Sequence, residues 1–174
     1  MSDLEISYYS SKELLDSPNL KEYLDFINSC YLPLHLHFHT FTTARFADLD
    51  HFKTYISEDD VTLAVARDIS TQDIVAAGGY KPMSKEAAEL TCMSTDPKLG
   101  GRGIGTQMDQ ELEKYARKKG FKKMHAMVIR EHGRVAEFYK RLGYETKSEE
   151  LFKAGEGPFP NIIDVTVFHM EKEL

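Results

Sequence analysis

Apolar residues in the second half of the chain change their spacing after residues 88–95. That run is β-like and closes at Asp96-Pro97, whereas the next apolar positions recur at intervals of 4, 4 and 3 residues, the spacing of one buried helix face. They are Ile104, Met108, Leu112 and Tyr115, and Gly120 follows where a helix C′ glycine belongs. Residues 123–129 form the next β-like run. The pattern predicts a strand–helix–strand unit whose two strands are parallel.

The first half predicts helices that pack against a hairpin. After a short strand near residues 4–9, one helix begins with Ser17 as N-cap and Pro18 at its first position, and a second covers residues 47–56. Their apolar faces are Leu20, Tyr23, Leu24 and Ile27 in the first helix, and Leu49, Phe52 and Tyr55 in the second. Val61, Leu63 and Val65 alternate with small or polar residues, and the polar turn DISTQD leads to a β-like run over residues 74–80. These two runs predict an antiparallel hairpin.

The end of the chain predicts a short helix over residues 134–142 that Gly143 stops, a loop KAGEGPFPN, and a last strand over residues 162–170. No repeat, low-complexity tract or linker divides the sequence, so we expect residues 1–174 to form one domain. Because the hairpin is antiparallel and the strand–helix–strand unit is parallel, the pattern predicts an α/β fold with a mixed sheet.

Composition favours a protein of a reducing, aqueous compartment. No run of about 18 apolar residues could span a bilayer, and the start MSDLEISYYSS lacks the features of a secretory signal. Cys30 and Cys92 lie far apart and outside any metal-ligand spacing, which fits free thiols. We expect a soluble cytoplasmic protein, with the nucleus as the alternative location, and no membrane partner.

The net charge of −6 hides an asymmetry. Residues 97–141 hold 12 Lys or Arg against 5 Asp or Glu, a net of +7, while the remaining residues hold 10 basic and 23 acidic side chains, a net of −13. A basic segment in an acidic protein favours a localised polyanion, such as a phosphorylated cofactor, over a nucleic-acid surface. Part of this charge, over residues 117–123, also fits a solvated helix end.

The basic segment contains a glycine cluster, KLGGRGIGTQM, at residues 98–108. Glycines at the start of a helix let an anion approach N–H groups that have no partner within the helix. A tight turn is the structural alternative. A dinucleotide fold needs the order G-x-G-x-x-G and an early βαβ unit; Glu131 could be its acidic residue, but the order here is G-x-G-x-G. A kinase-type P-loop is excluded because no Lys-Ser or Lys-Thr follows the last glycine.

Two motifs in residues 88–144 together resemble the GNAT superfamily of acetyl-coenzyme A dependent N-acetyltransferases. TDPKLGGRGIGTQM carries the Asp-Pro and the Gln/Arg-x-x-Gly-x-Gly/Ala loop of the family, and FYKRLGY at residues 138–144 carries its aromatic-Tyr-x-x-x-Gly-aromatic signature. One helix and one strand separate the motifs, as in the family. The resemblance implies a strongly twisted sheet of about six to seven strands flanked by about four helices.

The resemblance also implies which residues hold acetyl-coenzyme A. Main-chain N–H groups of the loop would hold its pyrophosphate, with charge from Arg102, and main-chain groups of Met93 and Thr95 would pair with the pantetheine arm. The predicted cofactor residues are Met93, Thr95, Gly100, Gly101, Arg102, Gly103, Ile104, Gly105, Thr106, His132 and Tyr139. The chain departs from the family in two places, because Gly100 replaces the usual Gln or Arg and His132 replaces a frequent Asn. No metal is implied.

For the chemistry, the resemblance implies Tyr139 as the acid that protonates the departing thiolate, because its position matches the family's frequent general acid. A tyrosine that only packs on the sheet is the alternative. Glu89 matches the catalytic glutamate of one branch of the family and would accept the amine proton, unless ordered water relays it. The oxyanion would be held by a backbone N–H near Met93.

Three histidines, His35, His37 and His39, form the other chemical feature of the sequence. In a strand they would share one face, with the H-x-H spacing of a metal site, whereas in a helix only His35 and His39 would align. No acidic or cysteine ligand lies close by, so we expect this segment to line the acceptor pocket instead.

These features predict an enzyme that transfers an acetyl group from acetyl-coenzyme A to a primary amine by direct attack in a ternary complex. The acidic remainder of the chain favours a cationic acceptor: a polyamine, another small amine, or the lysine amine of a peptide. A non-catalytic acyl-coenzyme A sensor on the same fold and a dinucleotide oxidoreductase are the competing hypotheses. The sequence does not decide whether the chain forms a homodimer.

Overall fold

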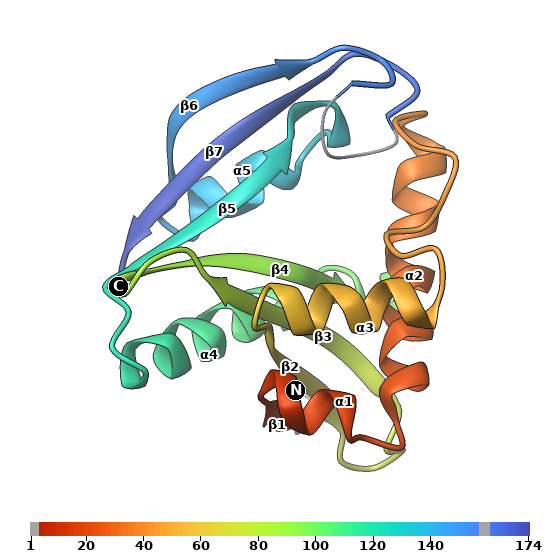
Figure 1. The fold of residues 1–174 in the computed structure, drawn as a ribbon, viewed down its shortest axis with the longest axis vertical. Coiled ribbons are helices and arrows are strands. Elements are labelled where there is room, and N and C mark those ends of the chain that lie inside the picture. Colours follow the sequence, from red (N-terminus) through yellow and green to blue (C-terminus); the bar gives the residue numbers. More distant parts are fainter. Residues whose placement is uncertain (1–3, 157–160) are drawn as a thin grey trace.

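A seven-stranded mixed sheet forms the centre of the computed structural model, which describes residues 4–156 and 161–174. The strands lie in the order β1-β2-β3-β4-β5-β7-β6 (Figure 1). Among the described residues only β4 and β5 pair in parallel, and all other neighbours are antiparallel; the parallel pair and the antiparallel β2–β3 hairpin were predicted. The strands are β1 Leu4–Tyr9, β2 Thr62–Asp68, β3 Ile74–Pro82, β4 Ala87–Thr95, β5 Lys123–Ile129, β6 Glu145–Phe152 and β7 Val165–Glu173.

Five α-helices cover the two faces of the sheet. They are α1 Ser11–Leu15, α2 Leu20–His37, α3 Leu49–Glu58, α4 Ile104–Lys118 and α5 Val135–Arg141, with short 3₁₀ turns at Pro97–Leu99 and Arg130–His132. The first three pack on one face and α4 and α5 on the other. In β2, Leu63 and Val65 point to the first face, while Ala64 and Ala66 point to the second and are also buried. The alternation with small residues therefore marks a sheet that is covered on both sides.

Several predicted elements are confirmed with small shifts. The predicted first apolar face is buried, but its helix starts at Leu20 after Asn19, because Ser17 lies in a turn and its carbonyl accepts from the Leu20 N–H. α3 starts two residues later than predicted, and Ile56 is buried more deeply than Tyr55. The last strand begins at Val165, and part of the predicted loop, residues 157–160, lies outside the described residues.

Two elements were not predicted. The five-residue α1 begins with a capping box in which Ser10 and Glu13 bond to each other's backbone N–H groups. β6 is an edge strand on which every residue except Phe152 is exposed, so no apolar alternation marks it.

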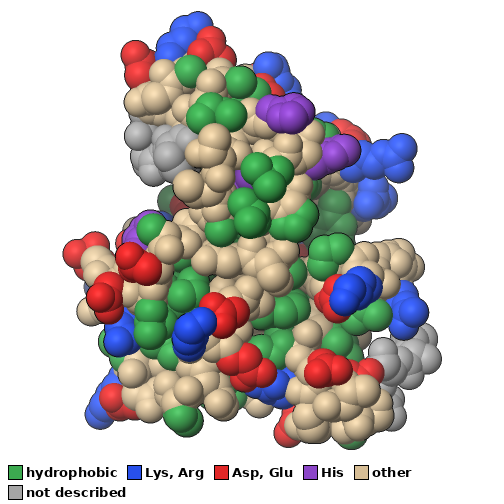
Figure 2. Space-filling model, turned by 90° about the vertical axis from the view of Figure 1, so that its right-hand side faces the viewer, with side chains coloured by type: hydrophobic (Ala, Val, Ile, Leu, Met, Phe, Trp, Pro, Cys, Tyr) green, Lys and Arg blue, Asp and Glu red, His purple; other side chains and the backbone are tan. Residues whose placement is uncertain are grey.

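Viewed from the side of α2, the surface mixes apolar, histidine and charged side chains (Figure 2). Leu32 and Leu36 on α2 are among the exposed large apolar residues. Within the described ranges, no helix has both the length and the apolar character needed to cross a bilayer.

The core beneath α4 contains two carboxylates. Asp109 and Glu113 are buried, Tyr144 donates a hydrogen bond of 3.1 Å to Asp109, and Lys172 lies 2.5 Å from Glu113. Burial, and then the charge of Glu113, raises the pKa of Asp109 to about 7. Ionisation of Asp109 at neutral pH therefore lowers the free energy of unfolding.

Replacement of Asp109 by Asn tests this cost. The pKa of Asp109 is higher in the folded than in the unfolded chain, so its ionisation costs stability as the pH rises from about 4 to about 7. Asn resembles the protonated acid, so the stability advantage of D109N over the wild type is expected to grow by on the order of 2–3 kcal/mol between pH 5 and pH 8. Urea unfolding at both pH values measures the difference. D50N, which alters an exposed acid on α3, is the control; a D109N gain that did not grow with pH would contradict the burial argument.

Candidate functional site

The glycine cluster forms a loop whose main chain is open to solvent at the start of α4. Gly101 and Gly103 have φ angles of +77° and +78°, which other residues rarely adopt, and no atom lies within 4 Å of where a Cβ would stand on either. Gly103 is the N-cap of α4, where no side chain caps the helix and the first turn contains no acidic residue. The positive end of a 15-residue helix is therefore free to receive an anion.

Strands β4 and β5 separate immediately upstream of this loop. Their parallel ladder joins only Ala87, Ala88 and Glu89 to residues 123–125, after which β5 stays paired with β7 as far as Ile129. Figure 1 shows the two strands diverging from that point. In the part of the chain that the structure describes, no residue of β4 beyond Glu89 pairs with β5. The rest of β4 therefore offers main-chain donors and acceptors to a ligand, as the resemblance implied for Met93 and Thr95.

A bulge in β4 marks the same segment. Ala77 pairs with Ser94 but Gly79 pairs with Thr91, so β4 holds one extra residue there, and Cys92 has a φ of +55°. The side chain of Met93 packs above Gly78, where a Cβ would lie 2.5 Å from its sulfur. Cys92 is buried in the core on the α1–α3 face.

Tyr139 on α5 lies beside the glycine loop. The preceding residue, Phe138, comes within 3.5 Å of the Cβ position of Gly105, and Thr95 Oγ1 is 3.4 Å from the same point. Tyr139 is 7% exposed, and its ring packs edge-on against Phe138 and Tyr144. Burial, followed by nearby Tyr31 and Asp109, raises the pKa of Tyr139 far above its ordinary value. The phenol therefore keeps its proton at physiological pH.

Glu89 stands at the last paired position of β4, where the strands begin to separate. Its side chain is 16% exposed and its Oε1 lies 3.6 Å from Lys81 Nζ, which also contacts Asp59 at 3.2 Å. The carboxylate is thus where the gap between β4 and β5 begins, and it forms an ion pair with Lys81. Its role as a base stays a prediction.

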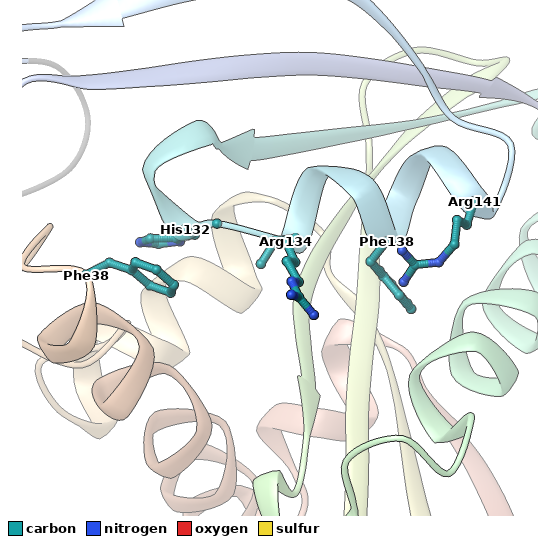
Figure 3. A pocket seen from close by; sticks show the side chains of 7 residues that line it. Phe38, His132, Arg134, Phe138 and Arg141 are labelled. Carbon is teal, nitrogen blue, oxygen red and sulfur yellow. The ribbon is translucent and has the colours of Figure 1, made fainter.

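A pocket of about 640 Å³ lies along α5 (Figure 3). It is lined by Phe38, His132, Gly133, Arg134, Val135, Phe138 and Arg141. Arg134 and Arg141, seven residues apart and both exposed, add positive charge to it. Of this set the sequence had singled out only His132 as a ligand-binding residue, although the excess of basic residues over 97–141 was the signal for the two arginines.

The histidines do not form the arrangement that a metal site requires. α2 continues through Pro33 to His37, and His39 has a φ of +53°, so the segment is neither a strand nor one continuous helix. His35 instead stacks on His132 with ring centroids 5.6 Å apart, and His132 Nε2 is 2.8 Å from Thr40 Oγ1. Burial and then the proximity of His35 lower the pKa of His132 to about 4. Among the described residues no cluster of three potential metal ligands occurs.

Solved structures with this fold extend over the whole chain. A GNAT family acetyltransferase from Elizabethkingia anophelis, solved with acetyl-CoA bound, matches with a TM-score of 0.68 and 15% identity over 100% of both chains. An IAA acetyltransferase from Bacillus cereus matches with a TM-score of 0.67 and 14% identity over 99% of this chain and 100% of its own. At this level of identity the matches establish the fold.

Sequence relatives match a smaller part of the chain. An uncharacterised N-acetyltransferase of Methanocaldococcus jannaschii is 41% identical over 63 residues, which are 36% of this chain and 28% of that protein. An uncharacterised acetyltransferase of Streptococcus pyogenes is 28% identical over 100 residues, 58% of this chain and 67% of its own length. The profile of the acetyltransferase (GNAT) family matches residues 21–144. Because this match spans well over half of the chain and includes both motifs, the predicted resemblance is confirmed, and the chain belongs to the acetyltransferase (GNAT) family.

Proposed function

We propose that the protein is an N-acetyltransferase that moves the acetyl group of acetyl-coenzyme A to a primary amine. One observation carries this proposal: the open N-terminus of α4 and the protonated Tyr139 lie at the same stretch of β4, where β4 has separated from β5. An anion at this helix end and the proton donor would thereby both lie along the edge of β4 that β5 has left. The reaction needs both, because the acetyl donor carries phosphates at one end and a thioester at the other.

The residues present fit acetyl-coenzyme A. The main-chain N–H groups of Gly101 to Thr106 would hold the pyrophosphate, with Arg102 adding charge, and Arg134 and Arg141 on α5 supply further cations. The main chain of Met93 and Thr95, on the part of β4 that does not pair with β5, would hold the pantetheine arm. Gly100 has no side chain to contribute, but its backbone remains. The Elizabethkingia anophelis structure, solved with acetyl-CoA, supports this choice of ligand.

When bound, acetyl-coenzyme A supplies an acetyl group activated as a thioester. The chain's own task is to move protons and to place the amine. Tyr139 donates the proton that the leaving thiolate takes up; burial keeps the phenol protonated until then, and the same raised pKa makes it a weaker acid. Glu89, or water beside it, accepts the proton that the amine loses, and a backbone N–H near Met93 stabilises the oxyanion.

The proposal requires only that the acceptor be a primary amine, which includes polyamines, other small amines and lysine side chains. It requires no second copy of the chain. Cys30 and Cys92 are unpaired thiols, which fits a cytoplasmic location. A sensor that binds the same ligand without turning it over is distinguished by the second experiment below.

Calorimetric titration tests the ligand. Acetyl-coenzyme A is expected to bind saturably and NADH to give no heat. In G103A, a Cβ at a φ of +78° forces the loop to move, so affinity for acetyl-coenzyme A is expected to fall on the order of tenfold. G120A is the matched control, because Gly120 has a φ of +96° and an equally open Cβ position at the other end of α4. Equal losses in both variants would mean that the loop does not hold the ligand.

Replacement of Tyr139 by Phe tests the proton donor. We expect turnover to fall on the order of a hundredfold while the affinity for acetyl-coenzyme A stays nearly unchanged, because only the phenol proton is removed. Thiol release with an amine acceptor measures turnover. Y144F is the control, because it removes a neighbouring buried hydroxyl that bonds to Asp109. Unchanged turnover in Y139F would remove Tyr139 from the mechanism, and acetyl-coenzyme A binding without turnover of any amine would favour the sensor.

A further inference from the structure

Arg45, in the loop between α2 and α3, places a guanidinium group against the diverging part of β4. Its Nη2 lies 3.0 Å from Thr91 Oγ1 and 3.4 Å from the hydroxyl of Tyr55. The guanidinium carbon is also 5.3–5.5 Å from the ring centroids of three aromatic residues, Tyr31, Phe46 and Tyr55. Aromatic walls and hydroxyl groups therefore fix this cation in one position.

The charge of Arg45 has no counter-ion in the described part of the chain. Its hydrogen-bond partners are the hydroxyls of Tyr55 and Thr91 and the side chain of Cys92, and within residues 4–156 and 161–174 no carboxylate forms an ion pair with it. Its Nε is shielded from solvent and has no partner. The neighbouring cation Lys81 has two carboxylates, Asp59 and Glu89. Arg45 as a whole is half-buried, and a partly shielded cation without a carboxylate is stabilised by an anion that arrives from outside.

Arg45 lies where the proposed acceptor amine would approach the free part of β4. Thr91, which it contacts, is two residues beyond Glu89 on the part of β4 that is free of β5. Tyr31 lies under the guanidinium and is close enough to Tyr139 to contribute to the raised pKa of that phenol. The thiol of Cys30 on α2 lies 3.5 Å from the carbonyl oxygen of Thr95, so the α2 side of the gap is built from this segment. Tyr31 therefore lies between Arg45 and the candidate acid, and Arg45 is on the face of the sheet opposite α4.

We propose that the acceptor is a primary amine that carries a carboxylate a few bonds from its nitrogen, and that Arg45 binds this carboxylate. The inference rests on the proposed function and narrows it. In the reaction the amine nitrogen bonds to the acetyl carbon, the carbon–sulfur bond breaks with its electron pair on sulfur, one amine proton leaves to the base, and the thiolate takes a proton from the acid. The carboxylate itself is unchanged. This acceptor differs from the cationic one that the bulk charge favoured.

Sets of three related acceptors provide the test. Each set contains an L-amino acid, its amide and its decarboxylated amine, for example phenylalanine, phenylalaninamide and phenethylamine, or the corresponding lysine set that ends in cadaverine. The amide has a less basic amine than the amino acid and the decarboxylated compound a more basic one, so a preference for the amino acid over both cannot come from amine basicity. With the wild type and saturating acetyl-coenzyme A, kcat/KM for the amino acid is expected to exceed both by about 10- to 100-fold, as for a charge-assisted hydrogen bond.

R45Q assigns the preference to Arg45. The ratio of kcat/KM for the acid to that for the amide is expected to fall to about one, mainly through KM for the acid, and R45K is expected to retain part of it because only the forked geometry is lost. R67Q is the matched control, because Arg67 pairs with Glu22 at the surface of β2. Melting curves with and without acetyl-coenzyme A confirm that each variant is folded and binds the donor.

The outcomes separate this inference from the proposed function. Acetylation of decarboxylated amines or polyamines as fast as, or faster than, the amino acids would overturn the carboxylate site and leave the N-acetyltransferase in place. A preference for the acid that R45Q does not change would overturn the role of Arg45. Binding of acetyl-coenzyme A without acetylation of any compound in the sets or of a polyamine would overturn both.

Discussion

The functional part of this protein depends on the short parallel ladder between β4 and β5. Three residue pairs hold the strands together. Within the described structure, no residue of β4 after Glu89 pairs with β5. Backbone groups that are shielded from water must find hydrogen-bond partners, so a strand that leaves its neighbour inside a sheet is stable only where water or a ligand completes it. The opening is maintained because β5 is held on its other edge by β7 over seven residue pairs. The sheet therefore provides a gap lined by main-chain groups of β4, and the helices α4 and α5 supply the other groups around it.

The groups around this gap have different electrostatic environments. The uncapped N-terminus of α4 and exposed arginines face solvent, where a multiply charged ligand can exchange its hydration for N–H groups. Tyr139 and His132 are close to these arginines in the chain but are buried, which raises the pKa of the phenol and lowers that of the imidazole, so both stay neutral. Neutral His132 suits a pocket that already contains two arginines, because a further positive charge would add repulsion. Charged groups at this site are therefore exposed, and its neutral titratable groups are buried.

The sequence predicted this part of the fold well because its signals are local. The apolar spacing of α4, the C′ glycine at Gly120 and the order of glycines at its start each depend on residues that are close in the chain, and β4, α4, β5 and α5 were found within one or two residues. Spacing between the two motifs also predicted that α5 lies near the loop, and Phe138 on α5 reaches the Gly105 position in the first turn of α4. β6 was missed because its exposed residues carry no apolar period, and α1 because one turn of helix gives too short a period to detect. The start of α2 was placed too early because Ser17-Pro18 resembles a helix start, while the chain uses those residues for a turn.

Arg45 shows what such signals cannot provide. Its partners are Tyr31 on α2, Tyr55 on α3 and Thr91 on β4, so its environment exists only after three separate elements have packed together. Bulk charge suggested a cationic acceptor, because the chain outside residues 97–141 carries a net charge of −13. Much of that charge is on exposed or paired carboxylates, which water and salt screen within about 10 Å. A single shielded guanidinium without a carboxylate acts at contact distance in a medium of lower dielectric constant, where each charge counts for more. The proposed carboxylate site therefore rests on the local cation and not on the net charge of the surface.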